Sequence, residues 1–317
     1  MKKIFGTNVY FLLLIILQLF GGNLLGPLKP FLHNQMWEAL LLTQFTFLIL
    51  PLIIYLIVTK KSPFETLRLK PLKIKNLLYV ALVALLVYPI ASFLGLFTNL
   101  FFHNNVNDVM QRMDSLPLWA FLLVIALTPA ICEELTVRGI ILSGYKKIGI
   151  NKAAIITGFM FAVLHLNPAQ FLYTFALGII LAYLVSVTGS IFSSMICHFI
   201  FNGISTVLTW NNIRNGTKSQ DITAMSKTVV ISTLSVLFVM AACATVAIIY
   251  IILHLKKVNA KQGYEDKNVL LDKGNNISYK EIEYNKYEKV EKNSLISLIG
   301  AYSPLAISVV LYVVYAL

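Results

Sequence analysis

Long apolar stretches constrain this chain more than any other feature of its sequence. They run over residues 5–26, 37–59, 77–102, 118–143, 152–167, 169–188, 190–210, 228–255 and 295–317. A helix needs about 20 residues to cross a hydrocarbon core of about 30 Å. Only 13% of the residues are charged, whereas a soluble domain has about a quarter. The pattern predicts an all-α protein, a polytopic transmembrane helical bundle of about nine spans. The stretch 152–167 is the shortest, and Pro168 marks its end.

Basic residues gather in three links between these stretches. They are Lys60, Lys61, Arg68, Lys70, Lys73 and Lys75, then Lys146, Lys147 and Lys152, then Lys256, Lys257 and Lys261. Positively charged links beside membrane spans lie in the cytoplasm, and nine spans with a cytoplasmic N-terminus satisfy all three placements. The net charge of +12 is then explained by topology and by attraction to anionic lipid. We expect the lipid bilayer as a partner and no nucleic acid.

The positions of the unusual residues divide the chain into three parts. Residues 1–116 form an N-terminal three-span region, and 117–211 form the core that carries the polar groups described below. Residues 212–317 hold two spans and a polar loop, 256–294, which is rich in both lysine and acidic residues. We expect this loop to be solvated in the cytoplasm or to form a marginal surface helix.

Few charged residues lie inside the apolar stretches. Of fourteen acidic residues only Glu133 and Glu134 lie well inside a stretch, since Glu38 and the others are at span edges or in loops, and Arg138 is the only arginine inside one. His165 and His198 also lie well inside. A charged side chain near the centre of a bilayer costs about 2.5–3.5 kcal/mol on insertion scales. Charged side chains with such a high insertion free energy predict a functional cavity. The alternative is a structural ion pair that only holds helices together.

Helical spacing predicts which of these groups share a face. Glu134 and Arg138 are four residues apart, so they can pair within one helix. His198 and Asn202 have the same spacing on a later span. We expect Glu133, Glu134, Arg138, His165, His198 and Asn202 to converge on one water-accessible cavity. Carboxylate, imidazole and amide groups in such a cavity can activate a water molecule and stabilise an oxyanion.

Three motifs in this region resemble those of a known family. They are Glu-Glu-x-x-x-Arg at 133–138, Phe-x-x-x-His at 161–165 and His-x-x-x-Asn at 198–202. Their order and their placement on successive apolar helices are similar to the CPBP family of CAAX prenyl endopeptidases and bacteriocin-processing or immunity proteins, also called the Abi family. The resemblance covers roughly 117–205, and Gly178 and Thr188-Gly189-Ser190 add to it. Thr136 and Val137 stand where the family often has an aromatic residue, so we expect altered packing there.

The resemblance implies an intramembrane endopeptidase of a bacterial plasma membrane, with a peptide or membrane-associated protein as substrate. It implies that Glu133 and His165 activate a water molecule. His198 and Asn202 would stabilise the oxyanion, while Glu134 and Arg138 would support Glu133. The family was long labelled metalloprotease. We expect no cofactor, and a zinc site formed by Glu133, His165 and His198 is the alternative.

Two other functions remain open at this point. One is a non-catalytic bacteriocin-immunity or scaffold membrane protein that uses the same cavity for binding. The other is a proton-coupled transporter that uses the two glutamates. Retention of function after Glu133→Gln would favour the scaffold, and uptake that depends on a proton gradient would favour the transporter.

Overall fold

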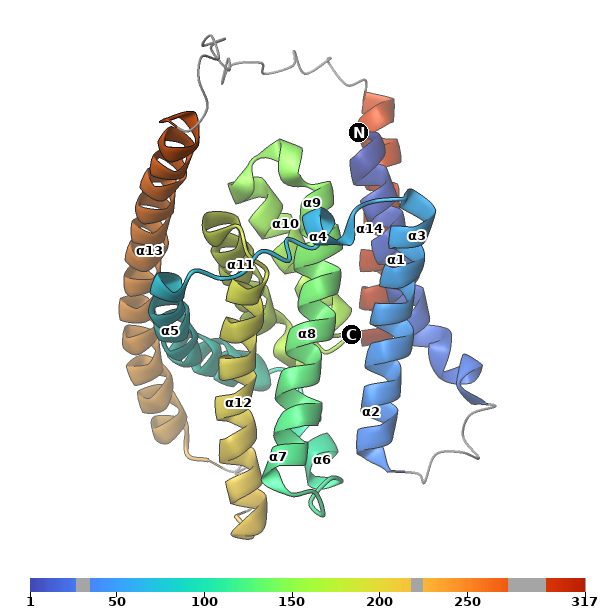
Figure 1. Cartoon of the computed structure of the whole chain (residues 1–317). Helices are drawn as coiled ribbons and strands as arrows, with labels where there is room; N and C mark the ends of the chain where they lie inside the picture. The colour runs from blue at the N-terminus through green and yellow to red at the C-terminus, as the bar shows by residue number, and fades with distance from the viewer. Residues whose placement is uncertain (27–34, 218–224, 273–294, 317) are drawn as a thin grey trace.

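The computed structural model describes residues 1–26, 35–217, 225–272 and 295–316 (Figure 1). These residues form helices joined by short links, with no strand among them. The first half comprises α1 (Lys2–Leu24), α2 (Met36–Gln44), η2 (Phe45–Ile49), α3 (Leu50–Thr59), α4 (Pro63–Thr66), α5 (Ile74–Asn99), α6 (Val106–Gln111), α7 (Leu118–Leu122), η3 (Leu123–Leu127), α8 (Thr128–Glu134), η4 (Leu135–Ile141) and α9 (Leu142–Gly144). The second half comprises η5 (Lys146–Ile148), α10 (Ile150–Leu164), η6 (Pro168–Gln170), α11 (Phe171–Thr188), α12 (Phe192–Arg214), α13 (Lys227–Asp272) and α14 (Leu295–Ala316).

The predicted polytopic helical bundle is confirmed. In the described part of the chain, eight helices are long and apolar enough to cross a membrane, and α10 is a ninth, shorter apolar helix. Two spans are composite, because α2, η2 and α3 join into Met36–Thr59, while α7 to α9 join into Leu118–Gly144. One boundary differs from the prediction. The fifth span ends at Leu164 rather than at 167, so His165 lies at the end of its helix.

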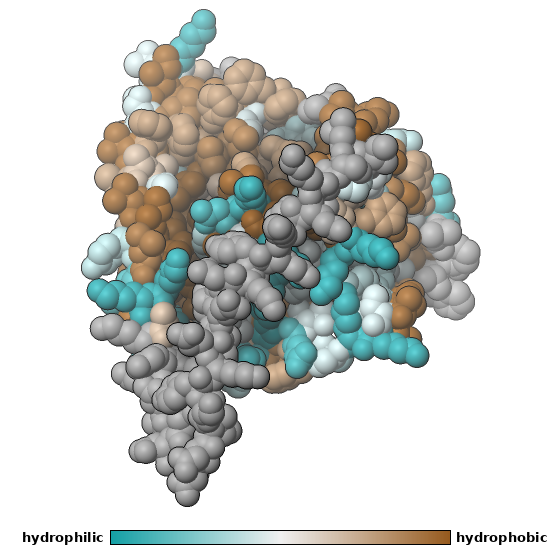
Figure 2. All heavy atoms as spheres, turned by 90° about the horizontal axis from the view of Figure 1, so that it is seen from above, coloured by the Kyte–Doolittle hydropathy of each residue, from teal (hydrophilic) through white to brown (hydrophobic). Residues whose placement is uncertain are grey.

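The composite helix Leu118–Gly144 runs through the middle of the bundle (Figure 1). On one side α1 packs beside α14, and on the other α5 packs beside α13. Large apolar side chains are exposed around the outside, for example Leu78, Trp119 and Val246. In Figure 2, seen from above, hydrophilic residues gather on the end face while brown apolar residues cover much of the perimeter. This distribution suits a multi-pass protein with lipid around its sides.

Two glycines let α10 and α11 approach closely. A Cβ atom on Gly178 would lie 2.7 Å from the Cα of Gly158, and one on Gly158 would lie 2.9 Å from a side-chain carbon of Ile179. Neither position therefore has room for a side chain. This contact brings the backbone of α11 close to the centre of the bundle, where Gly178 contributes its carbonyl oxygen to the site.

The basic link between α3 and α5 folds over one end of the bundle. The Arg68 carbonyl accepts from the backbone N–H of Ile191 at 3.1 Å, and the Lys70 carbonyl accepts from the Ser190 hydroxyl at 2.5 Å. The link is therefore attached to the turn that joins α11 to α12. The polar loop predicted at 256–294 begins as a continuation of α13, which extends to Asp272. Residues 273–294 lie outside the described residues.

Candidate active site

A buried ion pair lies at the centre of the site. Arg138 Nη1 donates to Glu134 Oε1 at 2.8 Å, and neither side chain has any exposed surface. His198 Nδ1 lies 3.0 Å from the same oxygen. Because an ionised carboxylate can only accept, His198 Nδ1 donates to Glu134. The pairing of Glu134 with Arg138 that the spacing predicts is confirmed, and Glu134 also holds the histidine of α12.

Arg138 is also held by three other segments, two through its guanidinium and one through its backbone carbonyl. Nη2 donates to the Gly178 carbonyl of α11 at 3.1 Å. The guanidinium carbon lies 4.3 Å from the centre of the Phe161 ring of α10, in a cation–π contact. From the basic link, Arg68 Nη1 donates to the Arg138 backbone carbonyl at 3.0 Å, and burial lowers the pKa of Arg68. Arg138 thus joins α10, α11 and the link to its own helix.

Glu133 faces a different direction from Glu134, as expected for adjacent residues about 100° apart on a helix. It is 9% exposed. Its Oε1 accepts from Gln44 Nε2 at 3.2 Å, across the interface between α2 and α8. Its Oε2 is buried and has no hydrogen-bond partner among the described residues. One carboxylate oxygen is therefore held while the other is left unpaired.

His165 lies where α10 ends and the chain reverses toward α11. Its Nδ1 lies 2.8 Å from the Phe161 carbonyl oxygen, and since a carbonyl only accepts, Nδ1 carries the hydrogen. The next residue, Leu166, has a φ of +48°, an uncommon conformation for a residue with a side chain. Strain of this kind gathers at functional sites. Phe161 lies edge-on to both His165, with ring centroids 4.7 Å apart, and His198, at 5.9 Å, so one aromatic ring packs against both imidazoles.

Asn202 lies one turn after His198 on α12. Its Nδ2 donates to the Ile125 carbonyl at 3.4 Å. Ile125 belongs to the π-helical segment η3, and a second π-helical segment, η4, follows Glu134. A π-helical turn alters the α-helical hydrogen-bond register and often occurs at functional sites. Glu133 and Glu134 therefore lie on α8, a short α-helical segment between the π-helical segments η3 and η4.

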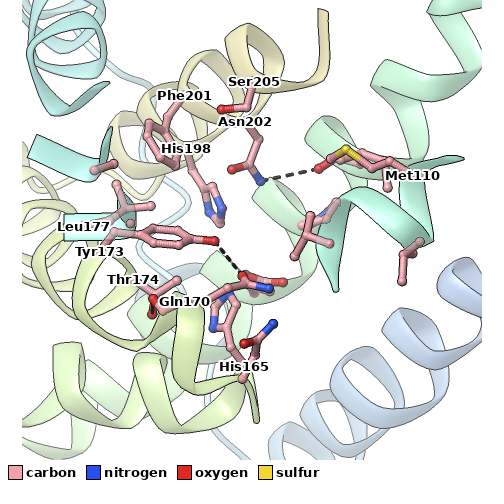
Figure 3. A pocket seen from close by; sticks show the side chains of 18 of the residues that line it. Met110, His165, Gln170, Tyr173, Thr174, Leu177, His198, Phe201, Asn202 and Ser205 are labelled. Atoms are coloured by element: carbon pink, nitrogen blue, oxygen red, sulfur yellow. Dashed lines mark hydrogen bonds between the residues drawn. The ribbon is translucent and has the colours of Figure 1, made fainter. Parts of the chain in front are cut away.

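A cavity of about 630 Å³ opens between these helices. Glu133, His165, His198 and Asn202 line it, together with Gln44. In Figure 3 the labelled His198 and Asn202 side chains of α12 point into the same space as His165. The volume is within the roughly 300–1,000 Å³ of small-molecule sites. The cavity can therefore hold a short extended peptide segment and not a folded domain.

The cavity extends away from the basic link. From Glu133 and His198 it reaches α6 and the exposed Asn105, at the end of the bundle opposite α4 (Figure 1). On the side of the link, the buried pair of Glu134 and Arg138 lies behind the lining. The two ends of the cavity therefore differ. The buried pair of Glu134 and Arg138 lies at the end near the basic link, and the opposite end reaches the surface at Asn105.

The expectation that six polar residues share one cavity needs a correction. Four of them line it, whereas Glu134 and Arg138 are packed behind His198. The partner of Glu133 is Gln44, a neutral residue that a pattern of charged residues and histidines does not single out. An amide within the apolar stretch 37–59 was the available signal. Arg68 was interpreted as a marker of topology alone, yet it contacts the Arg138 backbone.

The alternative zinc site does not assemble from these side chains. In the described part of the chain, no group of three or more His, Cys, Asp or Glu side chains is arranged to hold a metal ion.

Comparison with known proteins gives one family. Residues 115–204 match the family described as type II CAAX prenyl endopeptidase Rce1-like. Searches of curated proteins and of solved structures found no match. The matched segment begins just before α7 and ends within α12, and it contains all three motifs.

Proposed function

We propose that this chain is an intramembrane endopeptidase of the CPBP family, on the premise that residues 115–204 match the type II CAAX prenyl endopeptidase Rce1-like family. One observation carries the proposal more than any other. The unpaired Oε2 of Glu133 is buried in a cavity that His165, His198 and Asn202 also line. A buried carboxylate oxygen without a partner is costly. Glu134 Oε2 is also buried without a partner among the described residues, but Glu134 does not line the cavity, so Glu133 is the carboxylate placed to act as a proton acceptor.

The proposed reaction is hydrolysis of a peptide bond. Glu133 Oε2 takes a proton from a water molecule as its oxygen attacks the substrate carbonyl carbon, and the carbonyl π electrons move to the oxygen. Glu133 then returns the proton to the amide nitrogen as the carbon–nitrogen bond breaks. His165, with its hydrogen on Nδ1, leaves Nε2 free to hold the water molecule on the other side. The products are a new carboxyl group and a new amine.

His198 and Asn202 are the proposed donors to the oxyanion. Asn202 donates one amide hydrogen to Ile125 and has a second for the substrate. His198 donates through Nδ1 to Glu134, so donation through Nε2 requires the imidazolium form.

We further propose a bacterial plasma-membrane location with a cytoplasmic N-terminus. The basic links between spans support this orientation. With them in the cytoplasm, the cavity mouth beside Asn105 faces the other side of the membrane. The substrate is then a peptide or membrane-associated protein that presents an extended segment on that side, because the cavity is too small for a folded domain.

A mass-spectrometric assay tests the proposed hydrolysis. Purified protein in lipid nanodiscs is incubated in ¹⁸O-labelled water with a library of apolar membrane peptides and a farnesylated CAAX peptide. We expect cleaved peptides with one ¹⁸O atom in each new carboxyl group. We expect Glu133→Gln, which keeps the shape and removes the proton acceptor, to lower the rate by about 10²–10⁴-fold. Full activity per folded molecule in Glu133→Gln would exclude Glu133 as the base.

A further inference from the structure

Gln44 is a polar group of the cavity that belongs to none of the three motifs. It is the last residue of α2 and lies outside the matched segment 115–204. Its Nε2 donates to Glu133 Oε1 at 3.2 Å. Its own Oε1 is buried without a hydrogen-bond partner. The side chain therefore makes one hydrogen bond across a helix interface, and that bond is to the proposed base.

The orientation of this amide follows from chemistry. An ionised carboxylate has no hydrogen to give, so the amide must present its nitrogen to Glu133. The bond then occupies Oε1 of the carboxylate and leaves Oε2 as its unpaired oxygen. A hydrogen bond to one oxygen also restricts rotation of the carboxylate about its last torsion, which is otherwise broad.

The local structure holds Gln44 in place. The π-helical segment η2 starts at the next residue, Phe45. Within η2, the ring of Phe47 packs against Gly21 of α1, where a Cβ atom would lie 2.4 Å from the ring. The buried Phe47 and the absence of a side chain at Gly21 thus fix how this part of the span is rotated, and with it the direction of Gln44.

We propose that Gln44 is a positioning residue for the proposed hydrolysis. It holds the Glu133 carboxylate so that Oε2 faces the water molecule and the scissile carbonyl. The inference rests on the proposed function, since it assumes that Glu133 is the base. It assigns a role in the reaction to the N-terminal region, which the family match does not cover.

Kinetics of three variants test this role. We expect Gln44→Leu, which keeps the approximate size but removes the amide, to lower kcat by about 10–100-fold, the scale of a misplaced reacting group. We expect KM to change less than about 2-fold, because the interaction acts in the transition state. Gln44→Asn keeps an amide on a side chain one methylene shorter, and we expect it to recover part of the loss. Thr43→Val is the matched control, since Thr43 lies on the same helix and donates to the Leu40 carbonyl.

A double-mutant cycle separates positioning from a purely structural role. Glu133→Asp withdraws the carboxylate by one methylene and breaks the contact with Gln44. In that background we expect Gln44→Leu to lower kcat less than about 3-fold, because interacting residues are not additive. The cycle uses the peptide cleaved fastest by the unmodified protein, with rates expressed per folded molecule.

The outcomes distinguish the inference from the function on which it rests. Equal losses from Gln44→Leu in both backgrounds, or a loss confined to KM, would overturn the positioning role. Unimpaired Gln44→Leu beside an inactive Glu133→Gln would overturn the inference and leave the proposed function intact. Full activity of Glu133→Gln would overturn both.

Discussion

Arg138 should be the residue whose loss damages the fold most directly. Arg138→Leu removes the guanidinium and leaves the fully buried Glu134 carboxylate without its arginine partner, although the hydrogen bond from His198 remains. It also removes the hydrogen bond to the Gly178 carbonyl and the contact with the Phe161 ring. The substitution therefore disconnects three helices at one point.

The magnitude follows from the buried charge. Removing one partner of a buried ion pair costs about 3–5 kcal/mol, because the other charge stays buried and uncompensated. Arg138→Lys keeps the charge, but a single ammonium lacks the planar fork that reaches Glu134 and Gly178 together, so we expect an intermediate loss. The double variant Glu134→Gln and Arg138→Leu removes both charges, and we expect it to cost at least about 2 kcal/mol less than the sum of the two single changes.

Unfolding in mixed detergent micelles, followed by tryptophan fluorescence during titration with sodium dodecyl sulfate, measures these differences. Arg112→Met is the matched control, since Arg112 is exposed and exposed substitutions usually change stability by less than about 0.5 kcal/mol. The reasoning fails if Arg138→Leu is as stable as this control. It also fails if the two single changes add without coupling, since the ion pair would then contribute nothing as a pair.

Four further predictions concern the site and its orientation. His198→Ala and Asn202→Ala should each lower kcat by about 10²–10³-fold if they donate to the oxyanion; losses confined to folded yield would contradict that role. Gly178→Ala should destabilise by about 1–3 kcal/mol in the same titration, because its Cβ would lie 2.7 Å from a backbone carbon of α10; unchanged stability would contradict the close packing. A membrane-impermeant maleimide applied to intact cells should label Asn105→Cys and not Lys73→Cys, and the reverse pattern would overturn the orientation. Strong chelation should leave peptide cleavage unchanged, whereas a loss restored by added zinc would contradict a carboxylate–water mechanism.

The helical architecture could be predicted because it depends on physical limits that a single sequence displays. The length of each apolar stretch sets whether it can span a bilayer, and no distant contact is needed to judge it. The end of α10 was placed too late, at 167, because an apolar run does not show where a backbone bends. The left-handed Leu166 and the π-helical segments depend on tertiary packing, which spacing does not reveal.

The polar residues that could be predicted from the sequence are those whose insertion into a membrane costs the most free energy. Glu133, Glu134 and Arg138 stand out because a charge in an apolar stretch is expensive, and the four-residue spacing of Glu134 and Arg138 predicts their contact. Gln44 is neutral and carries no such signal, and its partner is 89 residues away in the chain. Arg68 was hidden for the opposite reason, since it stands among other basic residues whose placement topology already explains.

The two adjacent glutamates have different surroundings, and this difference predicts how their variants should behave. Glu134 accepts from Arg138 and His198 within the packed interior, so its charge is balanced whether or not a substrate is bound. Each carboxylate has one oxygen without a hydrogen-bond partner among the described residues, but only Glu133 lines the cavity, so its charge is the one that can reach a substrate. The helical rotation of about 100° between neighbouring residues is enough to separate these environments. Glu134→Gln should therefore lower the folded yield before it lowers activity per folded molecule, while Glu133→Gln should lower activity and leave the fold intact. If the two variants lost activity and stability in the same proportion, the two carboxylates would have to act as a single unit.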